Sequence, residues 1–477
     1  MSVVRESHGI PETWQLVPLK ELGVWSGGGT PSKAKPEFWS NGSIPWVSPK
    51  DMKTDHITDS EDHITCAAVE GSATKLIPAG SVLLVTRSGI LSHTLPVAIT
   101  TIPVTVNQDL KTITPKVGVL PEYVAWALRC FAREVLNTCS KQGTTVASIE
   151  TTALHRFEIP VAPLDQQKLI VEEIEKQFSR LDEAVANLKR VKANLKRYRA
   201  SVLKAAVEGR LVELEAELAR REGCSYETGE QLLQRILIER REKWSGRGKY
   251  KEPAAPDISN LPELPEGWVW ATYEQVSRLQ LGRQRAPKYH SGPNMRPYLR
   301  VQNVFEDRID LSDVMEMDFP PDDFAKYQLN PGDLLLNEGQ SPELLGRPAI
   351  YRGELPGSCF TNTLIRFQAI EGIRVEFALL VSRNNMHAGR FVDEGTITTN
   401  IAHLSIGRLA KVEFPLPPFA EQLRIVAEVD CRLSLLRETE AQVDANLKRA
   451  EKLKQAILSR AFSGGLVPGG EIREGAA

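Results

Sequence analysis

The chain has 477 residues, of which 42% are hydrophobic and 25% are charged, and its formal net charge is -2 at pH 7. This composition excludes collagen-like, low-complexity and largely disordered classes, and the near-zero charge leaves nucleic-acid binding to be decided by local patches. No apolar run approaches the roughly 20 residues of a membrane-spanning helix, and the first residues lack the basic-then-apolar pattern of a signal peptide, so we expect a cytoplasmic protein without a membrane partner.

The cysteines and acidic or histidine clusters do not form a recognisable metal site. No C-x-x-C pair occurs, and no cysteine has the short spacing to histidine that suits zinc. The residues between Asp55 and His63 are metal ligands by type, but no third spaced element completes a site, so we interpret them as a solvated loop. We predict no metal, and reduced, mostly buried thiols at Cys66, Cys130, Cys139, Cys224, Cys359 and Cys431.

Residues 1–159 have the size of one domain and mix strand and helix patterns. A Pro-Ala-Gly turn at Pro78 precedes the apolar run Val82–Leu84, which predicts a buried strand. The segment Gly27–Lys33 lacks the Gly-Lys-Ser/Thr ending of a phosphate-binding loop, so we expect no nucleotide there. It is typical of a solvent-exposed turn, and a turn that approaches a DNA backbone is the alternative.

Residues 160–212 are predicted to form one long helix, because apolar residues recur at spacings of three and four. Pro163 stands where this helix begins and Gly209 where it ends. A helix of about 43 residues would be on the order of 65 Å long, too long for a compact core, so its apolar stripe needs a partner. A basic run on it is typical of a solvated coiled-coil flank, with DNA or partner contact as the alternative. This run contains Lys189, Arg190, Lys192, Lys196, Arg197 and Arg199.

Residues 213–262 separate the two halves of the chain. They begin with a charge-alternating helical pattern that places Leu232, Leu233, Ile236 and Leu237 on one face. They end in Gly246–Pro256, whose composition predicts an exposed linker.

The second half of the chain repeats the first at an offset of about 255 positions. Residues 263–414 again have the size of one domain, and residues 415–467 again have the pattern of a long helix. About 15 of roughly 53 positions are identical between the two helical segments, without a gap, and chance pairing of two helices does not readily produce this match. The Pro-x-x-Pro-x-x-x-Gln string that opens the first helical segment at Pro160 recurs at Pro415.

The predicted architecture is therefore two α/β (α+β) domains in tandem, each followed by a long helix, with a flexible tail at 468–477. Packing the two helices together as an antiparallel coiled coil covers both apolar stripes and makes the chain a pseudo-twofold internal repeat. We expect the helix pair and any partner docking on it to depend on Phe178, Leu181, Val185, Leu188, Leu433, Leu436, Val443 and Leu447.

This layout resembles the specificity (S, HsdS) subunits of Type I restriction-modification systems across nearly the whole chain. The resemblance implies that the two domains are target recognition domains, each reading one half of a split, asymmetric DNA site. It also implies that the helices are spacers that dock two methyltransferase subunits, and helix length would then set the number of unread base pairs between the half-sites. The supporting strings are Gly28-Gly-Thr-Pro-Ser32, Ile44-Pro-Trp-Val47, both Pro-x-x-Pro-x-x-x-Gln strings, Thr228-Gly-Glu-Gln-Leu-Leu233, Lys251-Glu-Pro-Ala-Ala-Pro256, Leu264-Pro-Glu-Gly-Trp268 and Ala461-Phe-Ser-Gly-Gly-Leu466.

The same resemblance implies double-stranded DNA, two methyltransferase subunits and restriction/translocase subunits as partners. It places S-adenosylmethionine, ATP and Mg on those partners, with no cofactor in this chain. The sequence shows no G-x-S-x-G elbow, no H-E-x-x-H helix and no dinucleotide fingerprint, so we expect no catalytic residue and a non-catalytic subunit. The alternatives are a coiled-coil structural adaptor with two protein-binding domains, and a stand-alone nuclease or methyltransferase with an unrecognised motif.

Base recognition needs guanidinium and amide groups carried on loops, and the resemblance makes residues of this kind candidates. The first domain has Gly28-Gly-Thr-Pro-Ser32 where the second has Gly282–Lys288, so we expect two different half-sites. The candidates in the first domain are Thr30, Ser32, Lys33, Lys35, Lys50, Arg87, Ser88, Asn107, Gln108, Lys141 and Thr145. Those in the second domain are Arg283, Gln284, Arg285, Lys288, Asn337, Arg347 and Asn362.

Overall fold

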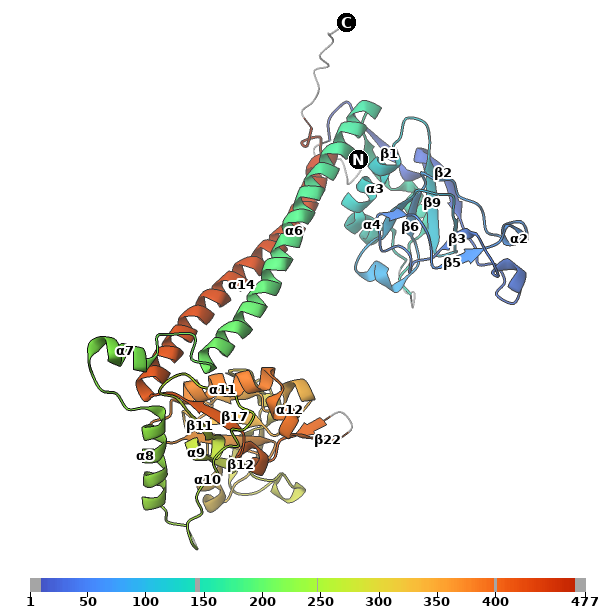
Figure 1. Cartoon of the computed structure of the whole chain (residues 1–477). Helices are drawn as coiled ribbons and strands as arrows, with labels where there is room; N and C mark the ends of the chain where they lie inside the picture. The colour runs from blue at the N-terminus through green and yellow to red at the C-terminus, as the bar shows by residue number, and fades with distance from the viewer. Residues whose placement is uncertain (1–9, 142–145, 247, 399–400, 468–477) are drawn as a thin grey trace. The chain divides into compact units, whose positions relative to one another are not determined.

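The computed structural model describes residues 10–141, 146–246, 248–398 and 401–467, and it divides into two compact units. Unit 1 comprises residues 1–189 and 444–477, and unit 2 comprises residues 190–443. Both division points lie inside the long helices. Each unit therefore contains one mixed α/β domain together with a part of each long helix, instead of leaving the helices as separate segments (Figure 1).

Unit 1 is built on a five-stranded sheet in the order β2-β9-β6-β7-β4, a three-stranded sheet in the order β5-β3-β8, and the pair β1-β10. All four residues of β6 are buried, as its apolar sequence predicts. The strands are β1 Gln15–Pro18, β2 Gly23–Gly27, β3 Ile44–Val47, β4 His56–Ile57, β5 Asp62–Ile64, β6 Val82–Val85, β7 Val97–Thr100, β8 Thr105–Val106, β9 Leu110–Pro115 and β10 Glu158–Val161. The short helices are η1 Leu19–Leu22, η2 Pro36–Phe38, α2 Cys66–Glu70, η3 Gly89–Ser92, α3 Pro121–Cys130, α4 Ala132–Cys139 and α5 Thr151–Arg156.

Unit 2 contains sheets in the orders β12-β21-β17-β19, β16-β13-β20 and β18-β23-β22, and the pairs β11-β24 and β14-β15. The strands are β11 Val269–Thr272, β12 Ser277–Leu281, β13 Met295–Leu299, β14 Val304–Phe305, β15 Arg308–Ile309, β16 Met315–Asp318, β17 Leu334–Asn337, β18 Gly339–Gln340, β19 Pro348–Ile350, β20 Cys359–Phe360, β21 Leu364–Ala369, β22 Thr396–Thr398, β23 Ile401–His403 and β24 Glu413–Leu416. The helices are α7 Glu215–Glu222, α8 Gly229–Glu242, α9 Tyr273–Val276, η4 Pro287–Tyr289, η5 Val301–Asn303, α10 Pro321–Tyr327, η6 Pro342–Leu344, α11 Val375–His387, α12 Arg390–Glu394 and α13 Ile406–Leu409.

The internal repeat extends to the order of the strands. The sheet β2-β9-β6-β7 of unit 1 corresponds to β12-β21-β17-β19 of unit 2, and β5-β3-β8 corresponds to β16-β13-β20. In both three-stranded sheets the central strand pairs antiparallel with one neighbour and parallel with the other. The two α/β domains therefore share one order of strands.

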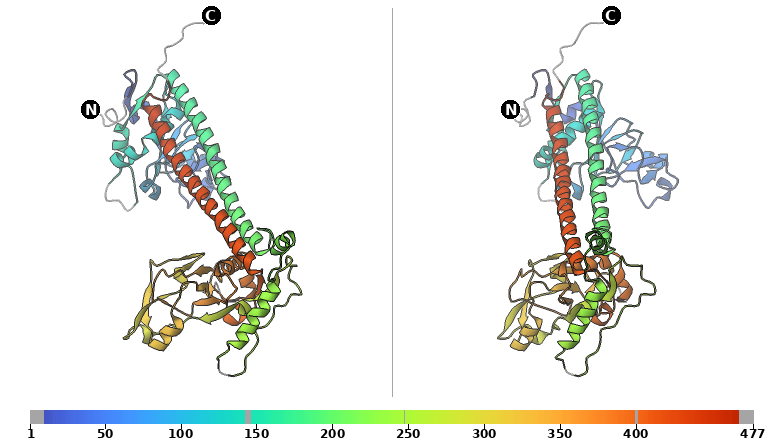
Figure 2. Two further views of the ribbon diagram at one scale, coloured as in Figure 1. Left: turned by 90° about the vertical axis from the view of Figure 1, so that its left-hand side faces the viewer. Right: turned by 60° about the vertical axis from the view of Figure 1, so that its left-hand side comes forward.

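The long helices α6, Leu164–Val207, and α14, Phe419–Phe462, have 44 residues each and run antiparallel, side by side (Figure 1 and Figure 2). In unit 1, the start of α6 at Ile170 and Ile174 joins the same core as the end of α14 at Phe462. In unit 2, the end of α6 at Val202 joins the same core as the start of α14 at Ile425. The predicted antiparallel pairing of the helices is confirmed.

Charged groups flank the apolar contact between the helices. Lys454 pairs with Asp182 at 2.6 Å in unit 1, and Arg199 pairs with Glu440 at 2.7 Å in unit 2. One member of the basic run on α6 therefore serves the helix pair, as its position on a coiled-coil flank predicts.

Two buried glutamines explain why the Pro-x-x-Pro-x-x-x-Gln string recurs. The Gln167 amide donates to the carbonyl oxygens of Ala162 (2.8 Å) and Gly118 (3.1 Å), and its Oε1 accepts from the Leu120 N–H at 3.0 Å. Gln422 makes the equivalent bonds in unit 2, donating to Pro417 and Gly372 and accepting from the Arg374 N–H at 2.8 Å. Each glutamine thus joins the start of a long helix to the loop that precedes α3 or α11.

A tryptophan near the start of each domain binds the long-helix residue that directly precedes the buried glutamine. Trp14 donates its indole N–H to Gln166 at 2.8 Å, and Trp268 donates to Glu421 at 2.9 Å. Burial raises the pKa of the Glu421 carboxyl, although it also accepts a hydrogen bond from the Glu215 N–H. The two junctions between domain and long helix therefore make the same contacts, but the acceptor is an amide in one and a carboxyl group in the other.

The segment between the halves has a packed part and an exposed part. Leu232 and Ile236, on the predicted apolar face of α8, are buried in the core of unit 2. Most of the described residues between Gly246 and Pro256 are exposed, as their composition predicts. The prediction that the thiols are mostly buried is correct for only half of them, since Cys66, Cys224 and Cys431 are exposed.

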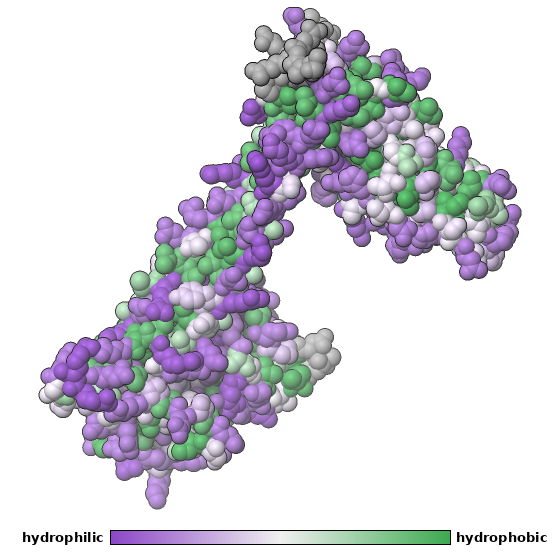
Figure 3. All heavy atoms as spheres, turned by 45° about the horizontal axis from the view of Figure 1, so that its top comes forward, coloured by the Kyte–Doolittle hydropathy of each residue, from purple (hydrophilic) through white to green (hydrophobic). Residues whose placement is uncertain are grey.

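Hydrophilic residues cover most of the face seen in Figure 3, with apolar residues in smaller groups among them. In the part of the chain that the structure describes, no helix is both long enough and apolar enough to cross a membrane.

Candidate nucleic-acid interface

One end of the sheets in unit 1 gathers the turns that follow β2, β3 and β6 and the turn that precedes β9. The Gly29 N–H donates to the Val106 carbonyl at 3.1 Å, and the Asn107 N–H donates to the Val47 carbonyl at 2.9 Å. The Thr86 N–H donates to the Asp109 carbonyl at 2.8 Å. We call this surface the loop edge of unit 1; it comprises Gly28–Lys35, Ser48–Lys50, Thr86–Ser88 and Asn107–Asp109.

The same end of unit 2 has the same backbone hydrogen bonds. The Arg283 N–H donates to the Phe360 carbonyl at 3.1 Å, the Thr361 N–H to the Leu299 carbonyl at 3.1 Å, and the Glu338 N–H to the Thr363 carbonyl at 2.9 Å. The loop edge of unit 2 therefore comprises Gly282–Lys288, Arg300–Asn303, Glu338–Gln340 and Thr361–Thr363. These backbone hydrogen bonds are common to both edges, whereas the side chains on the two edges differ.

Most of the predicted residues of the first domain are exposed on or beside its loop edge. The Thr30 hydroxyl donates to Gln108 Oε1 at 2.6 Å, and Lys33 and Lys35 lie over the rings of Trp39 and Phe38. Lys50 pairs with Asp62 and Glu61 at 3.0 Å each, and these hydrogen bonds raise the pKa of its ammonium group. The exposed candidates are Thr30, Ser32, Lys33, Lys35, Lys50, Arg87, Gln108 and Lys141, with Ser88 half-buried.

Two predicted residues of the first domain differ from that pattern. Asn107 is only 6% exposed, and its amide bonds within the turn to Asp109, so it shapes the turn instead of presenting an amide to solvent. Thr145 lies outside the described residues.

In the second domain the exposed candidates are Gln284, Arg285 and Lys288, and Asn362 is half-buried. Arg285 lies over the ring of Tyr298, and Lys288 over that of Tyr289. The structure thus brings these residues to the loop edge of unit 2, which corresponds to the edge of unit 1 where the candidates of the first domain lie.

Three predicted residues of the second domain are instead buried. Arg283 is stacked 3.8 Å from the centroid of the Tyr289 ring and pairs with Asp323 at 2.8 Å. Arg347 is 9% exposed, stacks on Phe305, and burial lowers the pKa of its guanidinium. Asn337 is fully buried at the end of β17. The sequence predicts all three as base readers on loops. The structure places Asn337 at the end of a strand and buries all three side chains, with at most 9% exposed, so exposure to a ligand is wrong for them in this structure.

Sequence reasoning missed Glu338 and His403 on the same edge. Glu338 Oε2 lies 3.3 Å from His403 Nδ1, and the backbone of His403 pairs with that of Gly339. A carboxylate can accept a hydrogen bond from the cytosine amino group. The available signal was the position of Glu338 directly after the mainly apolar strand Leu334–Asn337.

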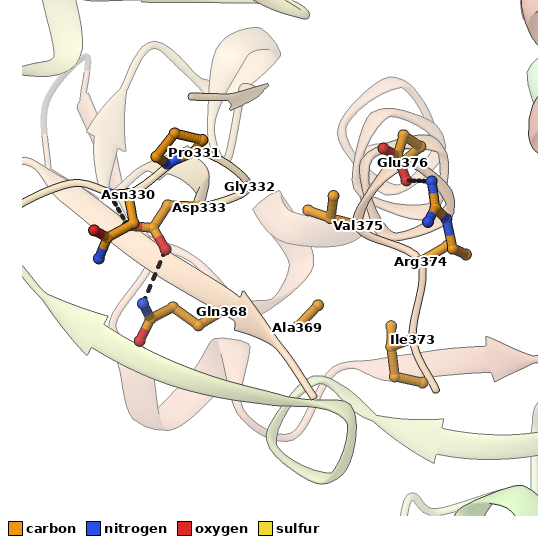
Figure 4. Close-up of a pocket in the computed structure, with 10 residues that line it drawn as sticks. All are labelled: Asn330, Pro331, Gly332, Asp333, Gln368, Ala369, Ile373, Arg374, Val375 and Glu376. Carbon is orange, nitrogen blue, oxygen red and sulfur yellow. Dashed lines mark hydrogen bonds and ion pairs between the residues drawn. The ribbon is translucent and has the colours of Figure 1, made fainter. Parts of the chain in front are cut away.

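The opposite end of β17 has a cavity of about 350 Å³ whose polar groups bind one another (Figure 4). Asp333 accepts from the Asn330 N–H and from Gln368, both at 2.9 Å, and Arg374 pairs with Glu376 at 3.0 Å. These contacts hold loops together. The exposed, polar candidates gather at the loop edge instead.

The acidic and histidine loop of the first domain is occupied by internal pairs. Asp59 lies 2.8 Å from His63 Nε2, and Asp55 pairs with Arg129 at 2.9 Å. Among residues 10–141, 146–246, 248–398 and 401–467, the structure forms no cluster of three or more potential metal ligands.

Comparison with known proteins agrees with this geometry. Residues 11–197 match the family described as Type I restriction modification DNA specificity domain. The chain is 48% identical over 158 residues to the EcoR124I/EcoR124II specificity subunit of Escherichia coli, which is 33% of this chain and 39% of that subunit. It is 32% identical over 185 residues to the MjaIX specificity subunit of Methanocaldococcus jannaschii, which is 38% of this chain and 40% of that subunit. The alignments thus span about two fifths of the length of these relatives.

The fold matches over a longer range. The crystal structure of the HsdS subunit from Thermoanaerobacter tengcongensis superposes with a TM-score of 0.57 at 17% identity, covering 97% of this chain and all of that one. The chain therefore has the same fold as that HsdS subunit, and the fold class predicted from the repeat is confirmed. By sequence, over part of its length, the chain is related to the specificity subunits of Type I restriction enzymes, as its motifs indicated.

Proposed function

We propose that this chain is the DNA-sequence-specificity subunit of a Type I restriction-modification complex, and that each loop edge reads one half of a bipartite, asymmetric DNA site. The observation that carries the proposal is the presence of two loop edges with the same backbone and different side chains. Arg87 of unit 1 stands where unit 2 has Gly339, and Pro31 stands where unit 2 has Arg285, as the shared hydrogen bonds align them. Two loop edges with the same backbone and different side chains suit a DNA site whose two halves differ in sequence.

In this proposal the helix pair scaffolds two methyltransferase subunits, and restriction subunits join through them. The chain itself is non-catalytic: S-adenosylmethionine, ATP and Mg are bound by the partners, and the complex acts on DNA in the cytoplasm. Methyl transfer from labelled S-adenosylmethionine to DNA by the purified chain alone would contradict this division of labour.

The proposal is tested with the chain co-purified with its methyltransferase subunit. The complex should bind DNA with an affinity that falls steeply as salt rises, because phosphate contacts release counterions. An adaptor with two protein-binding domains would show no such dependence.

Domain exchange then tests the assignment of one half-site to each domain. Replacing Leu264–Glu413 with the equivalent segment of a related protein should change one half of the modified site and leave the other half unchanged. A change in both halves together would contradict independent reading by the two edges.

A further inference from the structure

Both loop edges carry an amide side chain at the same point of the fold. Asn107–Asp109 and Thr361–Thr363 are the turns that enter β9 and β21, and their middle residues are Gln108 and Asn362. The neighbours on both sides differ between the units, since asparagine and aspartate in one turn correspond to two threonines in the other. The amide is thus the feature that the two turns share.

The backbone holds each of these turns from two sides. On one side, the first residue donates its N–H to the end of β3 or β13, as Asn107 does to Val47 at 2.9 Å. On the other side, the last residue accepts an N–H from the end of β6 or β17, as Asp109 does from Thr86 at 2.8 Å. A middle residue fixed in this way presents its side chain in a defined direction, which base recognition requires.

The two amides also have hydrogen-bonding groups to spare. Gln108 is exposed, and Thr30 donates to its Oε1 at 2.6 Å. Among the described residues its amide has no other partner, which leaves one lone pair of that oxygen and both N–H groups for a ligand. Asn362 is half-buried, and in the described part of the chain its side-chain amide makes no hydrogen bond. The acceptor and donor of a carboxamide match the N6 amino group and N7 of adenine in the major groove.

We infer that Gln108 and Asn362 are specificity-determining residues, each of which reads an adenine in the half-site of its own unit. The inference rests on the proposed function and adds to it the base class recognised at one position of each half-site. The adjacent turn has Arg87 in unit 1 and Gly339 at the equivalent position of unit 2, so the two edges differ in the other side chains that they offer to DNA.

The test uses the complex of the full chain with its methyltransferase subunit. The modified sites are first determined by sequencing genomic DNA for methylated bases, and binding is then measured on duplexes in which each half-site position is varied in turn. The variants are Gln108→Ala and Asn362→Ala, with Gln15→Ala and Asn330→Ala as matched amide controls away from the loop edges. Co-purification yield and thermal midpoint confirm that each variant is folded.

We expect Gln108→Ala to lower the preference for adenine at one position of one half-site by roughly 5- to 150-fold, the range for loss of a bidentate base contact. Asn362→Ala should do the same in the other half-site only, and the controls should retain the wild-type preferences. Retained preferences in both amide variants would overturn the inference. So would a uniform loss of affinity on all duplexes, which is the behaviour of a phosphate contact.

The outcome for the proposed function is separate. A wild-type complex that binds all duplexes alike would refute the proposed function itself. A selective wild-type complex whose half-sites contain no preferred adenine would refute only the assignment of the two amides.

Discussion

Replacing Gln167 with alanine tests whether the buried glutamine holds the first domain to its helix. The substitution removes three hydrogen bonds, to Ala162 at 2.8 Å, to Leu120 at 3.0 Å and to Gly118 at 3.1 Å. The Ala162 carbonyl is buried, whereas Gly118 is exposed and water can replace its bond. Since an unpaired buried group costs about 1–3 kcal/mol and each of the other two bonds about 0.5–1.5, we expect a loss of about 2–6 kcal/mol from the unfolding free energy.

The Leu120 amide gives a local readout. Its N–H donates to Gln167 Oε1, so hydrogen exchange of a peptide containing Leu120 should accelerate by about tenfold or more in Gln167→Ala, given that about 1.4 kcal/mol corresponds to a factor of ten. Gln177→Ala is the matched control, because that amide lies on the same helix and donates to Glu173 at 2.9 Å. Exchange and urea denaturation in Gln167→Ala that equal those of the control would refute the reasoning.

Three further results are expected. Burial raises the pKa of Glu421, so folding favours its protonated form. Relative to Glu421→Gln, the wild type should therefore lose stability as pH rises above about 4.5. Stability curves of the two proteins that run parallel from about pH 4 to 8 would contradict this. Leu436→Asp places a carboxylate at a position that is 4% exposed, so it should lower the free energy of unfolding by several kcal/mol and abolish co-purification of the methyltransferase subunit. Leu435→Asp, at a neighbouring position that is 66% exposed, should be tolerated. Inserting four residues after Ala193 lengthens α6 by about 6 Å and turns it roughly 40° beyond a full turn. The modified site should therefore gain one or two spacer base pairs. An active variant that still modifies sites with the original spacing would refute this.

The sequence predicts the helices well because their signals are local and occur twice. Apolar spacing, the initial prolines and the final glycines place both helices, and the repeat offset predicts that they are equal in length. Gly209 and Gly464 have φ of +67° and +76°, values that favour glycine at a helix end.

The domains were harder to predict because their strands are short and pair across long stretches of chain. β9 lies between β2 and β6, and no local pattern shows that Gly27 faces Lys111 or that Val85 faces Leu110. Burial of particular polar residues was also beyond a sequence pattern. Asn337 and Arg347 have the residue types of base readers, but sheet packing places them inside the unit.

Under the proposed function, the hydrogen bonds of Gln167 and Gln422 have a consequence for how new DNA specificities arise. Among the described residues, the Gln167 side chain binds only backbone groups, those of Gly118, Leu120 and Ala162, and Gln422 binds those of Gly372, Arg374 and Pro417. Leucine in one junction corresponds to arginine in the other, and alanine corresponds to proline, yet the bonds are the same. These glutamine bonds do not depend on the side chains of the residues they join, so they can form with any domain whose backbone follows this path. Under the proposed function, recombination that keeps this backbone path can exchange a whole recognition domain in one genetic event, and the glutamine bonds to the helix are retained.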